Sequence, residues 1–348
     1  MIVSARAFRR TVAVTAFAAA LTVSPLLAAI AQALTLNGAG ATFPAPLYER
    51  YFRDFRSATG GFQVNYQAVG SGAGIRQIVA GTVDFGGSDA AMTDAQIEQV
   101  DRGVILVPTA GGAVTLVYNL PGVTNLKISR TVMGGIFSGQ ITRWNDPKIV
   151  ADNAGVALPD SPIKPVVRAD SSGTTFIFTN HLSAVDPYFK GRIGVGTAPN
   201  WTISPIRGRG NPGVAAQVKR TSGSIGYVEL ATAKQAALTM ASVQNKKGDF
   251  VAPTLEATET ALETLTYPDN FRVFANDPED GYPIAGLTWI MVYKKYATAE
   301  QADGVKKLVQ WMLTEGQKLN NGLDYTKVPD SVAQKAIQTV NSEVTVGQ

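Results

Sequence analysis

Hydrophobic and polar positions follow two spacings along the chain, which predicts a succession of strands and helices. Residues 47–55 place Leu47, Tyr48, Tyr51 and further aromatic side chains at helical spacing, and residues 62–66 alternate as a strand does. Capping-box sequences at 93–96 and 298–301 predict two helix starts, the second for a helix reaching about residue 319. Spacing also predicts a short helix at residues 75–80 and the start of another helix at residues 174–182. The other strands it predicts are residues 82–85, 104–107, 114–118, 163–167, 225–228 and 287–293.

This alternation of strands and helices predicts an α/β architecture with largely parallel sheets. The chain has 348 residues, which is long enough for two domains. We find no internal repeat and no low-complexity segment. Residues 205–213 are rich in glycine and proline and are interpreted as a loop.

The first 33 residues have the pattern of a secretory signal peptide. Arg6, Arg9 and Arg10 form a basic start, and an apolar stretch follows over residues 12–30. Residues 31–33 (AQA) then supply the small-x-small pattern at which signal peptides are cleaved. A membrane anchor is the alternative, but Pro25 and the small-residue exit argue against it. We therefore expect export and cleavage after residue 33, leaving a soluble protein that is not inserted in the membrane.

Composition excludes several classes of function. Removing residues 1–33 takes away three arginines and no acid, so the formal charge falls from +4 to +1 and gives no support for nucleic-acid binding. The chain has no cysteine, which excludes disulfides, thiolate metal sites, cysteine nucleophiles and lipid attachment to a cysteine. His181 is the single histidine, so multi-histidine metal sites are excluded as well. We expect no metal and no cofactor.

Four short, glycine-bounded polar motifs stand near predicted strand ends or helix starts. Such loops suit a small oxyanion, because helix N-termini present unpaired backbone N–H groups and glycine lets the backbone approach closely. The hydroxyl groups of serine and threonine add hydrogen-bond donors on short side chains. Arg168 adds a planar, positively charged guanidinium group that can donate two hydrogen bonds to phosphate oxygens. One such loop is often only a helix cap, but four in one chain favour oxyanion binding. The motifs are residues 38–46 (GAGATFPAP), 70–74 (GSGAG), 84–89 (DFGGSD) and 168–175 (RADSSGTT).

Two competing motifs are weaker. Residues 208–213 (GRGNPG) match the dinucleotide pattern G-x-G-x-x-G, but they follow no clear strand and contain Pro212, so a loop that leads into a helix is the better interpretation. Residues 86–90 (GGSDA) nearly match a nucleophile elbow, but the triad would need His181, which we place inside a helix.

At these motifs the sequence resembles the periplasmic phosphate-binding protein of the phosphate-specific ABC transport system. The similarity extends over essentially the whole chain after residue 33 and includes residues 38–46, 83–89 (VDFGGSD), 167–174 (VRADSSGT) and 226–229 (GYVE). It implies a type II periplasmic-binding fold, in which two α/β lobes are joined by two hinge crossovers and phosphate lies between them. The function it implies is to bind inorganic phosphate and deliver it to the membrane permease of an ABC importer.

The resemblance also implies the residues that contact phosphate. Asp170 would orient Arg168 without touching the ligand. Ser171 and Gly87 depart from the family pattern, which often has glycine and alanine there, but in that pattern neither position is a side-chain ligand. The implied contacts are Thr42, Phe43, Ser71, Asp89, Arg168, Ser172, Gly173 and Thr174.

Asp89 has a physical role in an anion site. Phosphate near neutral pH keeps a proton that an ionised Asp89 can accept, whereas sulfate has none and would meet a like charge. A mismatch of about 4 kcal/mol corresponds to roughly a thousandfold discrimination. Asp89 therefore disfavours a second possibility, a receptor for sulfate or molybdate.

The site resembles that of a binding protein and not of an enzyme, because most of its groups are neutral donors. A secreted phosphatase or phosphoryl-transfer enzyme with Ser88 or Ser172 as nucleophile is the alternative from another class, and an additional sensory role stays open. We expect a monomeric periplasmic protein with one lobe at residues 34–110 plus 284–348, a second lobe at 111–283, and hinges near 109–112 and 282–285.

Overall fold

The computed structural model describes residues 34–60 and 62–347. The signal peptide expected at residues 1–33 lies outside this range. Among the described residues, no helix combines the length and the apolar character needed to cross a bilayer.

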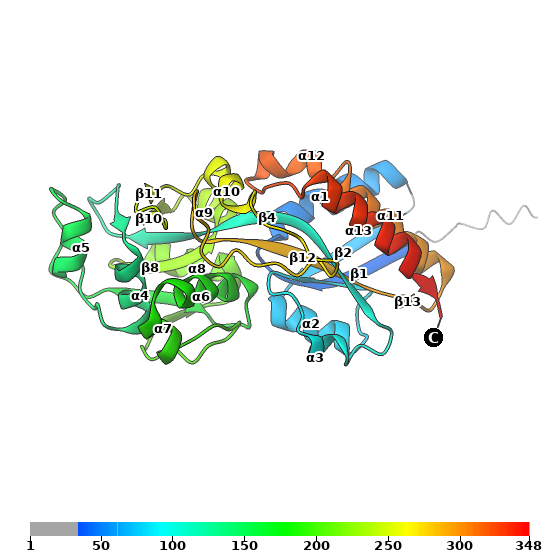
Figure 1. Cartoon of the computed structure of the whole chain (residues 1–348), viewed down its shortest axis with the longest axis horizontal. Coiled ribbons are helices and arrows are strands. Elements are labelled where there is room, and N and C mark those ends of the chain that lie inside the picture. Colours follow the sequence, from blue (N-terminus) through cyan, green and yellow to red (C-terminus); the bar gives the residue numbers. More distant parts are fainter. Residues whose placement is uncertain (1–33, 61, 348) are drawn as a thin grey trace, which may run out of the picture. The chain divides into compact units, whose positions relative to one another are not determined.

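Nine strands form one hydrogen-bonded sheet, and eight of them follow a single path in which two long strands connect two groups of shorter ones (Figure 1). The first sheet section contains the parallel strands β2 (Phe62–Ala68), β1 (Leu34–Gly40) and β3 (Phe85–Ser88). Strand β12 (Ala285–Tyr293) lies antiparallel between β3 and β4 (Val104–Asn119). All nine residues of β12 are buried, which explains why its sequence is apolar except at Thr288.

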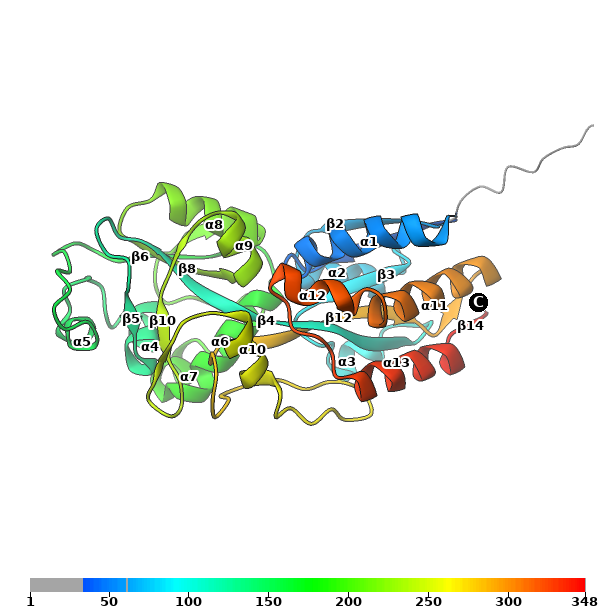
Figure 2. The ribbon, with the colours of Figure 1, turned by 90° about the horizontal axis from the view of Figure 1, so that it is seen from above.

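The second sheet section begins on the far half of β4. Residues 114–119 of β4 pair antiparallel with β8 (Ser224–Glu229), which pairs in parallel with β6 (Lys164–Arg168). β6 in turn pairs with β7 (Ile206–Gly208). The expectation of largely parallel sheets is therefore correct within each group, while the connecting strands β4 and β12 run antiparallel to their neighbours. Figure 2 shows these two strands passing together between the groups.

Helices begin where the parallel strands end. Helix α1 (Ala45–Thr59) buries Leu47, Tyr48, Tyr51, Phe52 and Phe55 along one face and stops at Gly60, whose φ of 62° is left-handed. Helix α2 (Ser71–Val79) follows β2, α6 (Gly173–Val185) follows β6, and α8 (Gly210–Arg220) follows β7. The C-terminal helices α11 (Ala299–Leu313) and α13 (Asp330–Glu343) pack on each other, and α11 also packs on β1.

Short elements complete the described chain. Their bounds are α3 Asp94–Ile97, β5 Lys127–Ile128, α4 Arg130–Ser138, α5 Pro147–Asp152, α7 Pro187–Arg192, α9 Leu230–Gln235, β9 Thr239–Met240, β10 Ser242–Gln244, β11 Phe250–Val251, α10 Leu255–Leu262, β13 Lys295–Tyr296, α12 Gln317–Asn320, the 3₁₀ turn Asn321–Leu323 and β14 Thr345–Val346.

Several element predictions are wrong in detail. The two strands expected at 104–107 and 114–118 are one strand, because the polar and glycine residues between them stay paired with β12. The strand expected at 82–85 begins only at Phe85, and the helix expected to reach about residue 319 ends at Leu313. Residues 205–213 contain β7 and the first turn of α8, so they are not only a loop. The capping box of residues 93–96 is confirmed.

Candidate functional site

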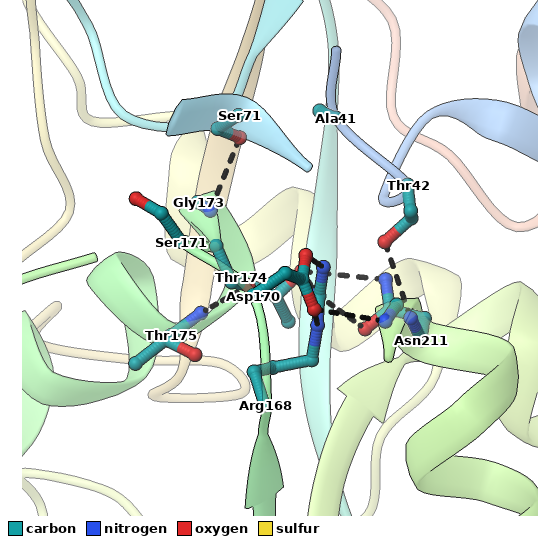
Figure 3. A network of polar contacts seen from close by, with 12 residues as sticks. Ala41, Thr42, Ser71, Arg168, Asp170, Ser171, Gly173, Thr174, Thr175 and Asn211 are labelled. Carbon is teal, nitrogen blue, oxygen red and sulfur yellow. Dashed lines mark hydrogen bonds and ion pairs between the residues drawn. The ribbon is translucent and has the colours of Figure 1, made fainter. Parts of the chain in front are cut away.

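The four motifs come together because each lies at the carboxyl end of a strand. Gly40 ends β1, Ser88 ends β3 and Arg168 ends β6, while Ser71 opens α2 three residues after β2. The carboxyl ends of parallel strands are the usual position of ligand sites in open α/β sheets. Strand β4 belongs to both sheet sections, and residues of the first, second and fourth motifs meet between the carboxyl ends of these sections (Figure 3).

Arg168 is the central cation of this cluster and is 4% exposed. Its Nε donates to Asp170 Oδ1 at 2.9 Å, and its Nη2 makes an ion pair with Asp170 Oδ2. Asp170 also accepts the backbone N–H of Gly210 at 2.9 Å. Burial alone would raise the pKa of Asp170, but the hydrogen bonds and charge of Arg168 outweigh it and hold that pKa below its ordinary value. Asp170 thus stays ionised and fixes the orientation of Arg168.

The free edge of the Arg168 guanidinium points toward Thr174 and Asn211. Its Nη1 donates to Thr174 Oγ1 at 3.2 Å and to Asn211 Oδ1 at 3.3 Å. Asn211 Nδ2 also donates to Thr174 Oγ1, at 3.3 Å. Thr174 was expected in this cluster and Asn211 was not. The sequence feature that could have indicated Asn211 is residues 208–213, a fifth glycine-bounded polar segment at the start of a helix.

Three hydrogen bonds join the first sheet section's loops to those of the second. Ser71 Oγ accepts the backbone N–H of Gly173 at 3.0 Å, and Thr42 Oγ1 accepts the backbone N–H of Asn211 at 3.1 Å (Figure 3). The backbone N–H of Gly72 donates to the carbonyl of Ser171 at 3.1 Å. These contacts bring the N-terminal ends of α2, α6 and α8 together around Arg168, so the partial positive charge of three helices adds to that of the guanidinium.

Asp89 is the acidic member of the cluster and is 1% exposed. Its Oδ1 accepts the Thr288 hydroxyl at 2.8 Å, and its backbone N–H donates to Ser71 Oγ at 3.2 Å. Burial raises the pKa of Asp89 to about 7, although the Thr288 hydrogen bond, the Arg168 charge and the Ser71 hydrogen bond act in the opposite direction. Nothing in the sequence pattern marks Thr288, because it lies in an otherwise apolar strand at a register shift with β4.

Phe43 and Ser172 lie beside these contacts and are buried, but the hydrogen bonds described for them lead elsewhere. Ser172 Oγ accepts the Thr175 N–H at 3.0 Å and so caps α6. The Phe43 carbonyl accepts the Tyr325 hydroxyl at 2.6 Å. Thr42, Ser71, Arg168, Gly173 and Thr174 are therefore linked by hydrogen bonds within the cluster, with Asp89 attached through Ser71.

Glu229, the last residue of the GYVE motif, is a second buried carboxyl group. It accepts the Thr232 N–H at 2.9 Å and thereby caps α9. Burial raises the pKa of Glu229 to about 7, against the opposing effect of its hydrogen bonds from Thr232. Within residues 34–60 and 62–347, no group of three or more histidine, cysteine, aspartate or glutamate side chains is placed to hold a metal ion.

Comparison with known proteins connects this architecture to a family. A model of the PBP superfamily domain matches residues 28–315. The phosphate-binding protein PstS of Pasteurella multocida is 39% identical over 319 residues, which cover 90% of this chain and 92% of that protein. The PstS of Haemophilus influenzae is 37% identical, covering 90% and 93%, and that of Methanocaldococcus jannaschii is 32% identical, covering 88% and 86%.

Solved structures agree on the fold. The high-affinity periplasmic phosphate-binding protein PfluDING has a TM-score of 0.75 at 22% identity, covering 88% of this chain and 94% of that one. A phosphate-binding protein from Stenotrophomonas maltophilia has a TM-score of 0.72 at 20% identity, covering 87% and 93%. The expected type II periplasmic-binding fold is confirmed.

Proposed function

Because the chain belongs to the PBP superfamily and, within it, to the PstS phosphate-binding proteins, we propose that it binds inorganic phosphate and delivers it to the membrane permease of an ABC importer. The observation that supports this function most directly is the buried cluster in which Arg168 meets the N-terminal ends of α2, α6 and α8. A compact oxyanion is the ligand that such converging donors suit best.

The phosphate contacts proposed for this chain come from both sheet sections. Arg168 supplies charge and a planar fork, held in place by Asp170. The hydroxyl groups and backbone N–H groups of the cluster now pair with one another at 3.0–3.3 Å, and each can exchange that partner for a phosphate oxygen. The proposed contacts are Thr42, Phe43, Ser71, Asp89, Arg168, Ser172, Gly173 and Thr174.

Asp89 is proposed to select phosphate against sulfate. In the ionised state it accepts the proton that phosphate keeps, while a sulfate oxygen would face it with like charge. A mismatch of about 4 kcal/mol corresponds to a thousandfold difference in affinity. Calorimetric titration of Asp89→Asn with sulfate tests this role. Sulfate binding should become measurable in the variant, and sulfate exclusion equal to that of the wild type would refute it.

The division into lobes at residues 34–110 plus 284–348 and 111–283 remains a proposal, as do the hinges near 109–112 and 282–285. It is supported by the behaviour of β4, which pairs with β12 up to Ala113 and with β8 from Val114 onward. Gly111 and Gly112 lie just before this change of partner, where a strand can bend most easily. Separation of the lobes about these strands would break the three hydrogen bonds that join the loops of the two sheet sections around Arg168.

A periplasmic location and a monomeric state are part of the same proposal. The leader-like pattern of residues 1–33 supports export, and the described residues contain no helix able to span a bilayer. Size-exclusion chromatography with light scattering on the protein lacking residues 1–33 tests the monomer.

The phosphatase alternative has little support from the candidate nucleophiles. Ser88 Oγ donates to the carbonyl of Ala90 at 2.5 Å, and Ser172 Oγ is occupied in capping α6. His181, the single histidine of the chain, is buried in α6 and contacts the Asn276 carbonyl at 3.0 Å. Neither serine is therefore paired with a general base in the part of the chain that the structure describes. Release of chromophore from a phosphate ester would favour the enzyme.

Calorimetric titration of the ligand-stripped protein with phosphate, arsenate and sulfate tests the proposed function directly. One-site binding of phosphate, competed by arsenate and unaffected by sulfate, is the expected result. Absence of phosphate binding, or equal binding of sulfate, would refute it.

A further inference from the structure

A pocket of about 510 Å³ opens beside the buried cluster, and we call it the mouth pocket. One wall comes from the region of α2 and the other from the segment after β6 together with the residue that precedes α8. The two sheet sections therefore each contribute a wall. The pocket is lined by Val69, Ala73, Arg76, Gln77, Ala169, Asp170, Ser171 and Arg209.

Each wall of the mouth pocket carries one exposed arginine, Arg76 on α2 and Arg209 before α8. In the described part of the chain, neither guanidinium takes part in an ion pair, whereas Arg50 and Arg130 are each paired with an aspartate. The one acidic residue that lines the pocket is Asp170, and its charge is already matched by Arg168. The pocket thus carries two uncompensated positive charges.

A close contact between residues 70–72 and residues 170–171, which we call the seam, separates the mouth pocket from the buried cluster. The Gly72 N–H bonds to the Ser171 carbonyl, and a Cβ at position 72 would lie 2.1 Å from Ser171 Oγ. A Cβ at Gly70 would lie 2.4 Å from Asp170 Oδ2. Ser71 lies between Gly70 and Gly72 in the chain and accepts the Gly173 N–H. Arg168 is hydrogen-bonded to Asp170, so both residues adjoin this seam. An anion in the mouth pocket therefore needs only the parting of this seam to reach Arg168.

We propose that Arg76 and Arg209 form an outer capture site, which attracts phosphate to the mouth pocket before the cleft closes on it. This inference rests on the phosphate-binding function proposed above. Beyond residue 33 the chain has a formal charge of only +1, so its net charge attracts an anion weakly at long range. Two local cations on opposite walls can then dominate the field at the opening, where the low-dielectric walls of a cleft focus it.

The experiment measures the phosphate association and dissociation rates by stopped-flow fluorescence. The chain has no cysteine, so Gln235→Cys provides a single thiol for an environment-sensitive dye. Gln235 is exposed and lines a different groove, formed by α1, α8 and α9. Calorimetry on the labelled protein first establishes that it binds phosphate. Absence of binding there, and in the unlabelled wild type, would overturn the proposed function and this inference together.

The test variant is the double substitution Arg76→Gln and Arg209→Gln. At 10 mM salt, where charges act over about 30 Å, we expect the association rate to fall about tenfold. At 1 M salt, where the range is about 3 Å, the variant and the wild type should associate at equal rates. The dissociation rate should not rise, because the substitutions leave the buried contacts unchanged. If it falls, it should fall by no larger a factor than the association rate.

A matched control carries the same loss of charge elsewhere. Arg56 and Arg192 are exposed, make no described ion pair and do not line the mouth pocket. The Arg56→Gln and Arg192→Gln double variant should keep the wild-type association rate within about twofold. The Arg76→Lys and Arg209→Lys variant should keep it too, because capture requires the charge and not the guanidinium shape.

Three results would overturn the proposal. The first is an unchanged association rate at low salt in the glutamine variant. The second is an equal loss in the Arg56 and Arg192 control, which would mean that net charge alone sets the rate. The third is a faster dissociation rate with unchanged association, which would place the two arginines in the closed complex instead of at its opening.

Discussion

Replacing Asp89 with asparagine should stabilise the ligand-free protein, although it damages ligand selection. Asp89 is 1% exposed, and burial raises its pKa from 3.8 to about 7 despite the opposing hydrogen bond from Thr288. One pKa unit corresponds to 1.36 kcal/mol of difference between the folded and unfolded states. Keeping this carboxylate ionised in the folded protein therefore costs about 4 kcal/mol at pH 8.

The sign of this effect depends on pH. Below about pH 4 the carboxyl group of Asp89 is protonated in both states, and it imposes no penalty. Between about pH 4 and pH 7 it ionises in the unfolded chain but keeps its proton in the folded one, so raising the pH lowers the free energy of unfolding by about 1.4 kcal/mol per unit. Above pH 7 the penalty is complete. Asparagine has the same shape and no charge, so the variant escapes it.

The assay is urea unfolding of phosphate-stripped protein at pH 4.5 and pH 8. We expect Asp89→Asn to increase the free energy of unfolding by about 4 kcal/mol at pH 8, with an unchanged dependence on urea, and by only about 1 kcal/mol at pH 4.5. Asp101→Asn, at an exposed aspartate with no described side-chain contact, is the matched control and should change neither value. An equal gain at both pH values, or a loss at pH 8, would refute the reasoning.

Three further predictions concern the cleft. Gly72→Ala should weaken phosphate binding at least tenfold by calorimetry, because its Cβ would lie 2.1 Å from Ser171 Oγ, and Ser171→Gly in the same chain should restore it. Asp170→Asn should lower the free energy of unfolding by about 3 kcal/mol in urea, because it leaves the charge of Arg168 buried without a partner. Thr288→Val should further raise the pKa of Asp89, so sulfate binding should appear at a higher pH in calorimetric titrations than it does in the wild type.

Each of these predictions can fail clearly. Unchanged affinity in Gly72→Ala would show that the seam is not closed in the phosphate complex. An unchanged free energy of unfolding in Asp170→Asn would show that solvent compensates the positive charge of Arg168. An unchanged pH dependence of sulfate binding in Thr288→Val would show that the hydroxyl does not control Asp89.

Local chemistry was readable from the sequence alone. The aromatic face of α1 and the capping box at residues 93–96 depend on residues three or four positions apart, and the structure shows both. The same holds for the glycine-bounded motifs, since a helix N-terminus after a strand is a local feature. The resemblance carried by those motifs predicted the fold, which the comparisons confirm.

The contacts of Asp89 and Asn211 depend on residues far apart in the chain. The register of β4 and β12 places Thr288 against Asp89, 199 positions away, and nothing in an apolar strand marks one hydroxyl for that contact. Asn211 reaches Arg168 and Thr42 only because β7 lies next to β6. The elevated pKa of Asp89 likewise has burial as its main cause, and the packing of distant segments determines burial. Spacing along a sequence records local geometry, whereas pairing, burial and charge proximity arise only when the sheet sections are brought together.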